Sequence, residues 1–191
     1  MTKVIMMCAP ARAGKDTILP ILMDQLRTEY GGQWKRFAFA DKLKQDCEER
    51  IQDEFGVSVW DDTQKHLFRQ VLIEYGMSKR DETAGNFLID HFFDQLEKDV
   101  NYIISDYRFI NEYHMISNRG IKTGKYSTHP IYIERFIELN GLVFELPPVI
   151  PQEVKNYPLI KSYAKIVRVK YYTCKDWQVE LALNKYEIIS L

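Results

Sequence analysis

The sequence predicts an α/β protein in which a parallel β-sheet is flanked by helices, and three observations lead to this fold class. The continuous apolar run Val4–Cys8 is typical of a strand buried on both faces of a parallel sheet. A second such run, "VNYIISD", ends at Asp106. Segments with helical spacing of apolar residues alternate with the strands along the chain. This order favours parallel strands joined by right-handed crossovers.

The first strand is followed by a tight turn and a helix. The turn covers Ala9–Gly14, and the helix begins near Lys15 with Ile18, Ile21, Leu22 and Leu26 on one stripe. We expect Pro20 in the first turn of this helix, where a missing N–H is tolerated. The "GGQ" that starts at Gly31 should end the helix.

A second strand and two further helices are expected next. Trp34–Ala40 has the apolar and aromatic content of a short strand. Asp41 can cap a helix that runs to about Phe55 and stops at Gly56. The following helix, "QKHLFRQVLIEYG", presents one apolar face and is expected to end at Gly76.

The remaining elements become harder to read toward the C-terminus. A polar linker, "MSKRDETAG", precedes a helix from about Asn86 to Leu96, and "RFINEYHMISNRG" predicts a short helix that stops at Gly120. "AKIVRVKYYT" predicts a strand and "CKDWQVELALNKYEII" a closing helix. We expect a single domain over residues 1–191, with an insertion or lid within about 120–165.

Composition and charge exclude several classes of protein. The 46% hydrophobic and 28% charged fractions are ordinary globular values, which argues against extended disorder. The net charge of −1 provides no global field for a nucleic-acid polymer or an anionic membrane, and no apolar run is long enough to span a bilayer. The three cysteines, which are far apart, show no disulfide or metal-ligand spacing. This usage predicts a reducing compartment, and so a cytoplasmic location.

The turn after the first strand has the form of a phosphate-binding loop. A Walker A loop reads G-x-x-x-x-G-K-[ST]; here Ala9 replaces the first glycine and Asp16 the hydroxyl residue, with Thr17 one place later. Backbone N–H groups of such a turn form an anion-binding nest, Gly14 permits close approach, and Lys15 supplies positive charge. The alternative is a strand–turn–helix unit whose Gly-Lys pair is incidental.

The residue sequence of this loop indicates a particular family. "RAGKDT" resembles the R-S-G-K-D-T loop of phage-type deoxynucleoside monophosphate kinases, in which Asp at the place of Asp16 is normal. "FAFADKLK", "FRQVLIEYGMSKRDETAGNFLIDHFF" and "YIISDYRFINE" are similar to further segments of that family. Animal-type phosphomevalonate kinases share this framework, including Ser-Gly-Lys-Asp. The resemblance covers about Val4 to Gly120, and Ala9 departs from both families.

The resemblance implies a three-layer P-loop kinase fold and a set of site residues. Mg²⁺ and ATP would be the cofactor and phosphoryl donor, and Asp16 and Asp106 would order the metal. A helical arm of about residues 57–98 would bind a nucleoside monophosphate as acceptor. The catalytic residues would be Lys15, Arg12, Asp106 and Arg108; the nucleotide-binding residues Ala11, Ala13, Gly14, Lys15, Asp16 and Thr17; and the acceptor-binding residues Asp41, Lys44, Arg69, Arg80 and Arg108.

Several of these residues have a simpler structural interpretation. Asp106 can cap the following helix, and Arg108 can pair with Glu112 one turn later. Arg69 and Arg80 can be ordinary surface residues. Tyr75, Phe87 and Phe92 can stack on a base, although aromatic residues at helical spacing are more often core. "RGIKTGK" and Arg135 are candidates for a lid, with a charged surface loop as the alternative.

The function class follows from this set of cations and carboxylates. Phosphoryl transfer to a phosphate oxygen needs positioning and charge neutralisation rather than a strong base. We therefore expect an ATP-dependent deoxynucleoside monophosphate kinase, with a phosphomevalonate-type kinase and a catalytically silent nucleotide-binding protein as alternatives. Kinases of this kind are often dimers, so a homodimer is among the expected states.

Overall fold

The computed structural model describes residues 1–10, 13–139, 142–145 and 157–170. Its chain divides into two compact units. Unit 1 contains residues 1–36 and 98–191, and unit 2 contains Phe37–Glu97. The predicted closing helix lies outside the described residues, as do Ala11 and Arg12.

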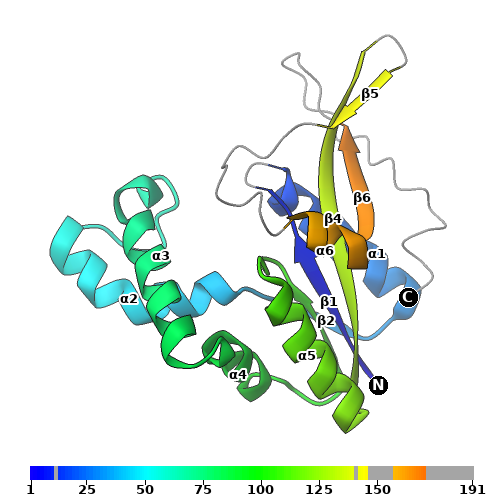
Figure 1. The fold of residues 1–191 in the computed structure, drawn as a ribbon, viewed down its shortest axis with the longest axis horizontal. Coiled ribbons are helices and arrows are strands. Elements are labelled where there is room, and N and C mark those ends of the chain that lie inside the picture. The colour runs from blue at the N-terminus through cyan, green and yellow to red at the C-terminus, as the bar shows by residue number, and fades with distance from the viewer. Residues whose placement is uncertain (11–12, 140–141, 146–156, 171–191) are drawn as a thin grey trace. The chain divides into compact units, whose positions relative to one another are not determined.

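The sheet confirms the predicted α/β class. Its strand order is β2-β3-β1-β4-β5, with β6 pairing with β4 on a separate path (Figure 1). β5 runs antiparallel to β4, while the other five strands form a parallel sheet flanked by helices. The strands are β1 (Thr2–Cys8), β2 (Gln33–Phe37), β3 (Val100–Ile104), β4 (Tyr126–Leu139), β5 (Leu142–Glu145) and β6 (Lys165–Lys170).

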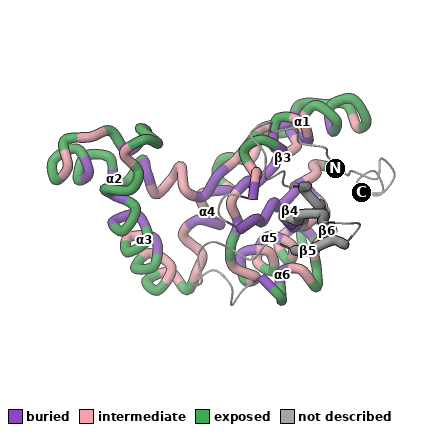
Figure 2. Tube along the Cα trace, turned by 90° about the horizontal axis from the view of Figure 1, so that it is seen from above, coloured by how far each residue is buried: buried purple, intermediate pink, exposed green. Residues whose placement is uncertain are grey.

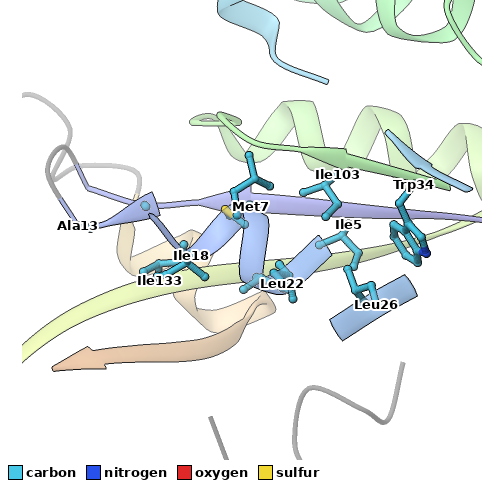
Figure 3. Packing of buried hydrophobic residues seen from close by; sticks show 12 residues of the cluster. Ile5, Met7, Ala13, Ile18, Leu22, Leu26, Trp34, Ile103 and Ile133 are labelled. Atoms are coloured by element: carbon cyan, nitrogen blue, oxygen red, sulfur yellow. The ribbon is translucent and has the colours of Figure 1, made fainter. Parts of the chain in front are cut away.

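In unit 1, helices lie on both faces of the sheet (Figure 1). α1 (Lys15–Tyr30) packs on one face, where alternate strand residues such as Ile5, Met7 and Ile103 meet its apolar stripe (Figure 3). α5 (Ile110–Thr123) and α6 (Tyr157–Tyr163) lie on the other face. There Tyr126 of β4 donates a hydrogen bond to the Ile116 carbonyl of α5 at 2.9 Å. The central strand β1 is therefore covered on both sides, as its apolar run predicted.

Unit 2 is helical apart from the end of β2. α2 (Phe39–Phe55) and α3 (Lys65–Glu82) share a core around Cys47, Ile51 and Phe68. α4 (Asn86–Asp94) follows and buries Leu88, Ile89 and Phe92. Figure 2 shows the outer sides of α2 and α3 largely exposed, which is the amphipathic pattern that the sequence predicts.

The start of α2 and the place of Pro20 within α1 differ from the prediction. β2 ends at Phe37, and α2 begins at Phe39 with Ala38 as N-cap, so the expected strand to Ala40 and cap at Asp41 were wrong. Asp41 lies in the first turn of α2, where its charge still favours the helix dipole. Pro20 lies in the second turn of α1 rather than the first, so its ring nitrogen cannot donate to the carbonyl of the preceding turn.

Two glycines predicted to end helices lie inside them instead. α3 continues through Gly76 to Glu82, so much of the expected polar linker is helical, and α5 continues through Gly120 to Thr123. In both cases the glycine allows close packing: a Cβ on Gly76 would lie 3.0 Å from Leu43 Cδ1, and one on Gly120 would lie 2.7 Å from Tyr126 Cε2. Both glycines were predicted to end a helix, whereas each makes room for a neighbouring side chain inside the helix.

Candidate phosphate-binding site

The end of the loop between β1 and α1 has a backbone conformation that suits an anion site. Gly14 is the N-cap of α1 and adopts a left-handed conformation with φ 81° and ψ 16°, which favours glycine. Its carbonyl accepts hydrogen bonds from the N–H groups of Thr17 at 3.1 Å and Ile18 at 3.0 Å, so the helix starts directly after it. The first N–H groups of α1 therefore border the loop, where an anion can accept them.

The loop is anchored to the core on the α1 side. The N–H of Ala13 donates to the carbonyl of Pro10 at 3.1 Å, and the Ala13 side chain is buried. It packs in the same cluster as Ile18 and Ile133 (Figure 3). The methyl group at position 13 thus fixes the end of the loop, while Gly14 beside it stays half-buried.

The two charged residues that open α1 contact each other. Lys15 Nζ donates to Asp16 Oδ1 at 2.7 Å, with 23% of the Lys15 side chain and 86% of the Asp16 side chain exposed. Such an exposed pair contributes about 0–1 kcal/mol to stability. It therefore holds the lysine only weakly, and an incoming phosphate can compete for the ammonium group. Thr17 is exposed on the same turn.

Asp106 and Arg108 lie at the same edge of the sheet as this loop. β3 pairs in parallel with β1, with Ile104 opposite Met6, so Asp106 is level with Cys8, the last residue of β1. Asp106 is half-buried and Arg108 exposed. The N-cap of α5 is Phe109, so Asp106 is not the cap of that helix.

Glu112 organises the turn that carries Arg108. Its buried carboxylate accepts hydrogen bonds from the backbone N–H of Arg108 at 2.9 Å and of Phe109 at 3.2 Å. This arrangement is the glutamate half of a capping box. Glu112 thus contacts Arg108 through the Arg108 backbone N–H, and this bond fixes the start of α5 shortly after Asp106.

The charges of Arg108 and Glu112 act on Cys8, the last residue of β1. Burial raises the pKa of the Cys8 thiol to about 12, while the positive charge of Arg108 lowers it and the negative charge of Glu112 raises it further. Burial likewise raises the pKa of Tyr157, with Arg108 again opposing. Cys8 is therefore a neutral core thiol, and Arg108 provides positive charge on the α5/α6 face at this edge.

The expected acceptor-binding residues Asp41, Lys44, Arg69 and Arg80 all lie in unit 2. Lys44 is buried, with Nζ 3.4 Å from Asp62 Oδ1 and 5.2 Å from the centroid of the Trp60 ring. Arg69 is exposed on α3 and Arg80 is half-buried eleven residues later, which places them on one face of the helix.

The three aromatic residues considered for base stacking differ in burial. Phe92 is fully buried in unit 2 and packs edge-to-face against Phe37 at 5.0 Å, so it belongs to the core. Tyr75 and Phe87 are half-buried and lie edge-to-face with their ring centroids 6.3 Å apart. Of the three, only Tyr75 and Phe87 retain surface that a base could contact.

The lid candidate "RGIKTGK" lies away from the phosphate loop. Arg119–Thr123 form the last turn of α5, and Gly124 caps it. Tyr126 then pairs with Thr2, so this segment lies at the amino end of β1, opposite the loop. The side chain of Arg135 lies outside the part of the chain whose side chains are described.

Sequence reasoning missed an ion pair at the carboxyl edge. Lys161 Nζ of α6 donates to Glu134 Oε1 of β4 at 2.8 Å, and Glu134 is buried. The signal was a glutamate following the alternating run "IYIE", at a point where the buried face of β4 would otherwise be apolar. α6 itself was not predicted, because only seven residues form it.

The carboxylates at this edge fit Mg²⁺ as a kinase binds it. Mg²⁺ in such sites takes one or two protein carboxylates, and phosphates and water complete the shell. Asp16 and Asp106 provide that number of hard oxygen ligands. Within the described residues there is no group of three or more His, Cys, Asp or Glu side chains that could hold a metal without such a ligand.

Together these features define an α/β protein in which a left-handed glycine leads from the loop after the central strand into a helix, and a carboxylate and an arginine follow the neighbouring strand. No protein-family model matches the chain, and no curated protein matches its sequence. Among the described helices, none combines the length and apolar character needed to cross a membrane.

Proposed function

We propose that this protein is an ATP-dependent kinase of the P-loop class that phosphorylates a deoxynucleoside 5′-monophosphate. One observation carries the proposal: a left-handed Gly14 opens α1 directly before Lys15, while Asp106 follows the adjacent strand β3 two residues after Ile104, which pairs with Met6 of β1. Phosphate cradle, lysine and metal-ordering carboxylate thus share one edge of the sheet. The carboxyl edge of a parallel sheet is where ligands bind in such folds.

The reaction would transfer the γ-phosphoryl group of ATP to a phosphate oxygen of the acceptor. The bond from the γ-phosphorus to the bridging oxygen breaks, ADP leaves with that electron pair, and a new P–O bond forms to the acceptor. Mg²⁺ would neutralise charge on the transferring phosphates when bound. The acceptor oxygen is already anionic, so the site needs no general base.

Each residue of unit 1 then has a defined task. The N–H groups at the start of α1 and Lys15 bind the donor phosphates, which requires Lys15 to leave Asp16. Asp16 and Asp106 would hold the metal. Arg108, fixed at its backbone by Glu112, orients the acceptor phosphate with its forked donors. Arg12, and the unit 2 residues Asp41, Lys44, Arg69 and Arg80, are proposed on the resemblance alone.

An ADP-release assay with Mg-ATP tests the proposal. The acceptors are the deoxynucleoside monophosphates and phosphomevalonate, with a control that lacks acceptor. Turnover with one or more nucleotides supports the proposal and gives the base preference. Turnover with phosphomevalonate alone transfers the assignment to that kinase type, and ATP binding without any turnover identifies a silent nucleotide-binding protein.

A further inference from the structure

Buried polar side chains concentrate at one edge of the sheet. Among the described residues, four polar or charged residues are buried: Lys44, Ser105, Glu112 and Glu134. The last three belong to unit 1: Ser105 and Glu112 follow the carboxyl end of β3, and Glu134 lies within β4, two residues past the position that pairs with Cys8. Ser105 and Glu112 belong to the turn already described, whereas Glu134 has no part in it.

Glu134 and Lys161 lie on the α5/α6 face, just past the end of β1. Tyr132 pairs with Cys8 in the last register position of β1 and β4, and Glu134 follows two residues later on the same face. Lys161 Nζ lies 2.8 Å from Glu134 Oε1 and 4.9 Å from the centroid of the Tyr132 ring. The ammonium group is thus held above the strand that neighbours the phosphate loop.

Tyr157 connects this pair to Arg108. Its ring lies 5.7 Å from that of Tyr132, and the charge of Arg108 acts on its hydroxyl. Arg108 therefore acts electrostatically on Tyr157, while Lys161 lies over the neighbouring Tyr132 ring. Two cations of this kind, one forked and one compact, form a suitable pair of ligands for a phosphate dianion.

Stabilisation of the fold does not by itself explain the ion pair between Glu134 and Lys161. A buried pair must offset the desolvation of both charges, and apolar side chains of the same size often stabilise as well or better. The Lys161 side chain keeps 23% of its surface exposed, while Glu134 keeps 9%. Lys161 is therefore accessible to an incoming anion, whereas Glu134, which pairs with it, is nearly covered.

We infer that Lys161 is a further ligand of the acceptor phosphate and that Glu134 occupies its ammonium group until the phosphate binds. The inference rests on the proposed function, because it names a substrate contact of the same site. The phosphate competes with the Glu134 carboxylate for the Lys161 ammonium group, so removing the two charges should have opposite effects on anion binding. A purely structural ion pair would give no such opposition.

The first arm of the test is kinetic and uses the full chain. Lys161→Met should raise the KM for the deoxynucleoside monophosphate about tenfold or more while the KM for ATP changes less than about twofold. Lys161→Arg should restore most of the loss. Arg27→Met, which removes an ion pair at the far end of α1, is the control and should change neither constant. Equal losses for both substrates, or no loss, would overturn the inference.

The second arm does not need turnover. Inorganic phosphate is titrated against the thermal midpoint of a Lys15→Ala parent, in which the loop contributes less binding. Lys161→Met should reduce the phosphate-induced shift and Glu134→Gln should enlarge it. Shifts that change in the same direction, or a parent that phosphate does not stabilise, would contradict the inference. Opposite changes without any nucleotide turnover would retain the anion site and reject the kinase assignment.

Discussion

At the scale of single residues, Lys15 should matter for phosphoryl transfer and hardly for the stability of the fold. Lys15 pairs with Asp16, whose side chain is 86% exposed, and Lys15 does not belong to the buried core cluster that α1 forms with the sheet. Lys15→Ala should therefore lower phosphoryl transfer at least about 100-fold, because a transition-state charge loses a donor. The thermal midpoint should stay close to that of the wild type, since exposed pairs contribute about 0–1 kcal/mol. ADP release and circular dichroism give the two measurements, and wild-type turnover would exclude the loop from the mechanism.

Arg108 should act on the acceptor rather than on ATP. Its side chain is exposed, and its position is fixed through the backbone N–H that Glu112 accepts. Arg108→Ala should raise the acceptor KM about tenfold or more and leave the ATP KM nearly unchanged, because a forked donor to phosphate is lost. Steady-state kinetics with each substrate varied in turn measure both constants. An equal rise in both would mean that Arg108 serves the donor.

Site residues can be predicted from the sequence when they are close together along the chain. Gly14, Lys15 and Asp16 are consecutive, so their joint placement at a helix start follows from the strand and turn pattern. Glu134 and Lys161 are 27 residues apart and meet only because α6 packs on β4. No local spacing predicts such a contact, which is why this pair was missed while the loop was not.

At the scale of secondary-structure elements, α5 continues through Gly120 because this glycine packs closely against Tyr126. Substitution of Gly120 tests this explanation. A Cβ on Gly120 would lie 2.7 Å from Tyr126 Cε2 and 2.8 Å from the Tyr126 carbonyl oxygen. Alanine is the better helix former by about 1 kcal/mol, but the clash with fixed backbone should outweigh this, so Gly120→Ala should destabilise the protein by about 1–3 kcal/mol. Urea unfolding measures the difference. Asn118→Ala, at an exposed site of the same helix, is the matched control and should be neutral or slightly stabilising.

The contact between α2 and α3 gives a prediction for alkaline pH. Tyr75 donates to Asp46 at 3.1 Å, and burial together with this bond raises the pKa of Tyr75 to about 12. The folded state therefore retains a proton that the unfolded state loses near pH 10, so the contribution is complete below that pH and is lost between about pH 10 and 12. Tyr75→Phe should cost about 0.5–1.5 kcal/mol at neutral pH.

The comparison that isolates this contact is the difference in stability between wild type and Tyr75→Phe as pH rises. The difference should shrink from about pH 10 upward, because the variant has no phenol to titrate. Urea unfolding at neutral pH and at several alkaline values provides the data. A difference that stays constant to pH 12 would show that the Tyr75 hydroxyl contributes no proton-linked stability.

Element prediction succeeded where the apolar pattern and a left-handed glycine agreed. Gly31 and Gly56 both follow their helices with positive φ, as expected of C-terminal caps. Gly76 and Gly120 are also glycines, but they lie inside helices and contact Leu43 and Tyr126. The local sequence does not predict these tertiary contacts. The start of α2 was misplaced for a related reason, since Ala38 caps it by an extended backbone and not by a side chain.

At the scale of the whole molecule, each unit has its own hydrophobic core. Unit 1 packs α1 against alternate residues of the sheet, and unit 2 packs α2 against α3 around Phe68 and Ile51. The sequence predicted one domain with a helical arm at about residues 57–98, whereas the compact unit also includes α2. Because stability is local where cores are separate, ligands can protect the two units independently.

Hydrogen exchange can therefore assign the two substrates to the two units. A non-hydrolysable ATP analogue with Mg²⁺ should slow amide exchange in the first turn of α1, because the donor phosphates would accept hydrogen bonds from those backbone N–H groups. A deoxynucleoside monophosphate should slow exchange at the start of α5 and in α2 and α3, if Asp41, Lys44, Arg69 and Arg80 bind it. The Lys15→Ala variant is the control for the first effect and should lose it. Protection confined to unit 1 with the monophosphate would remove the four unit 2 residues from the acceptor site and leave Arg108 and Lys161 as its cations.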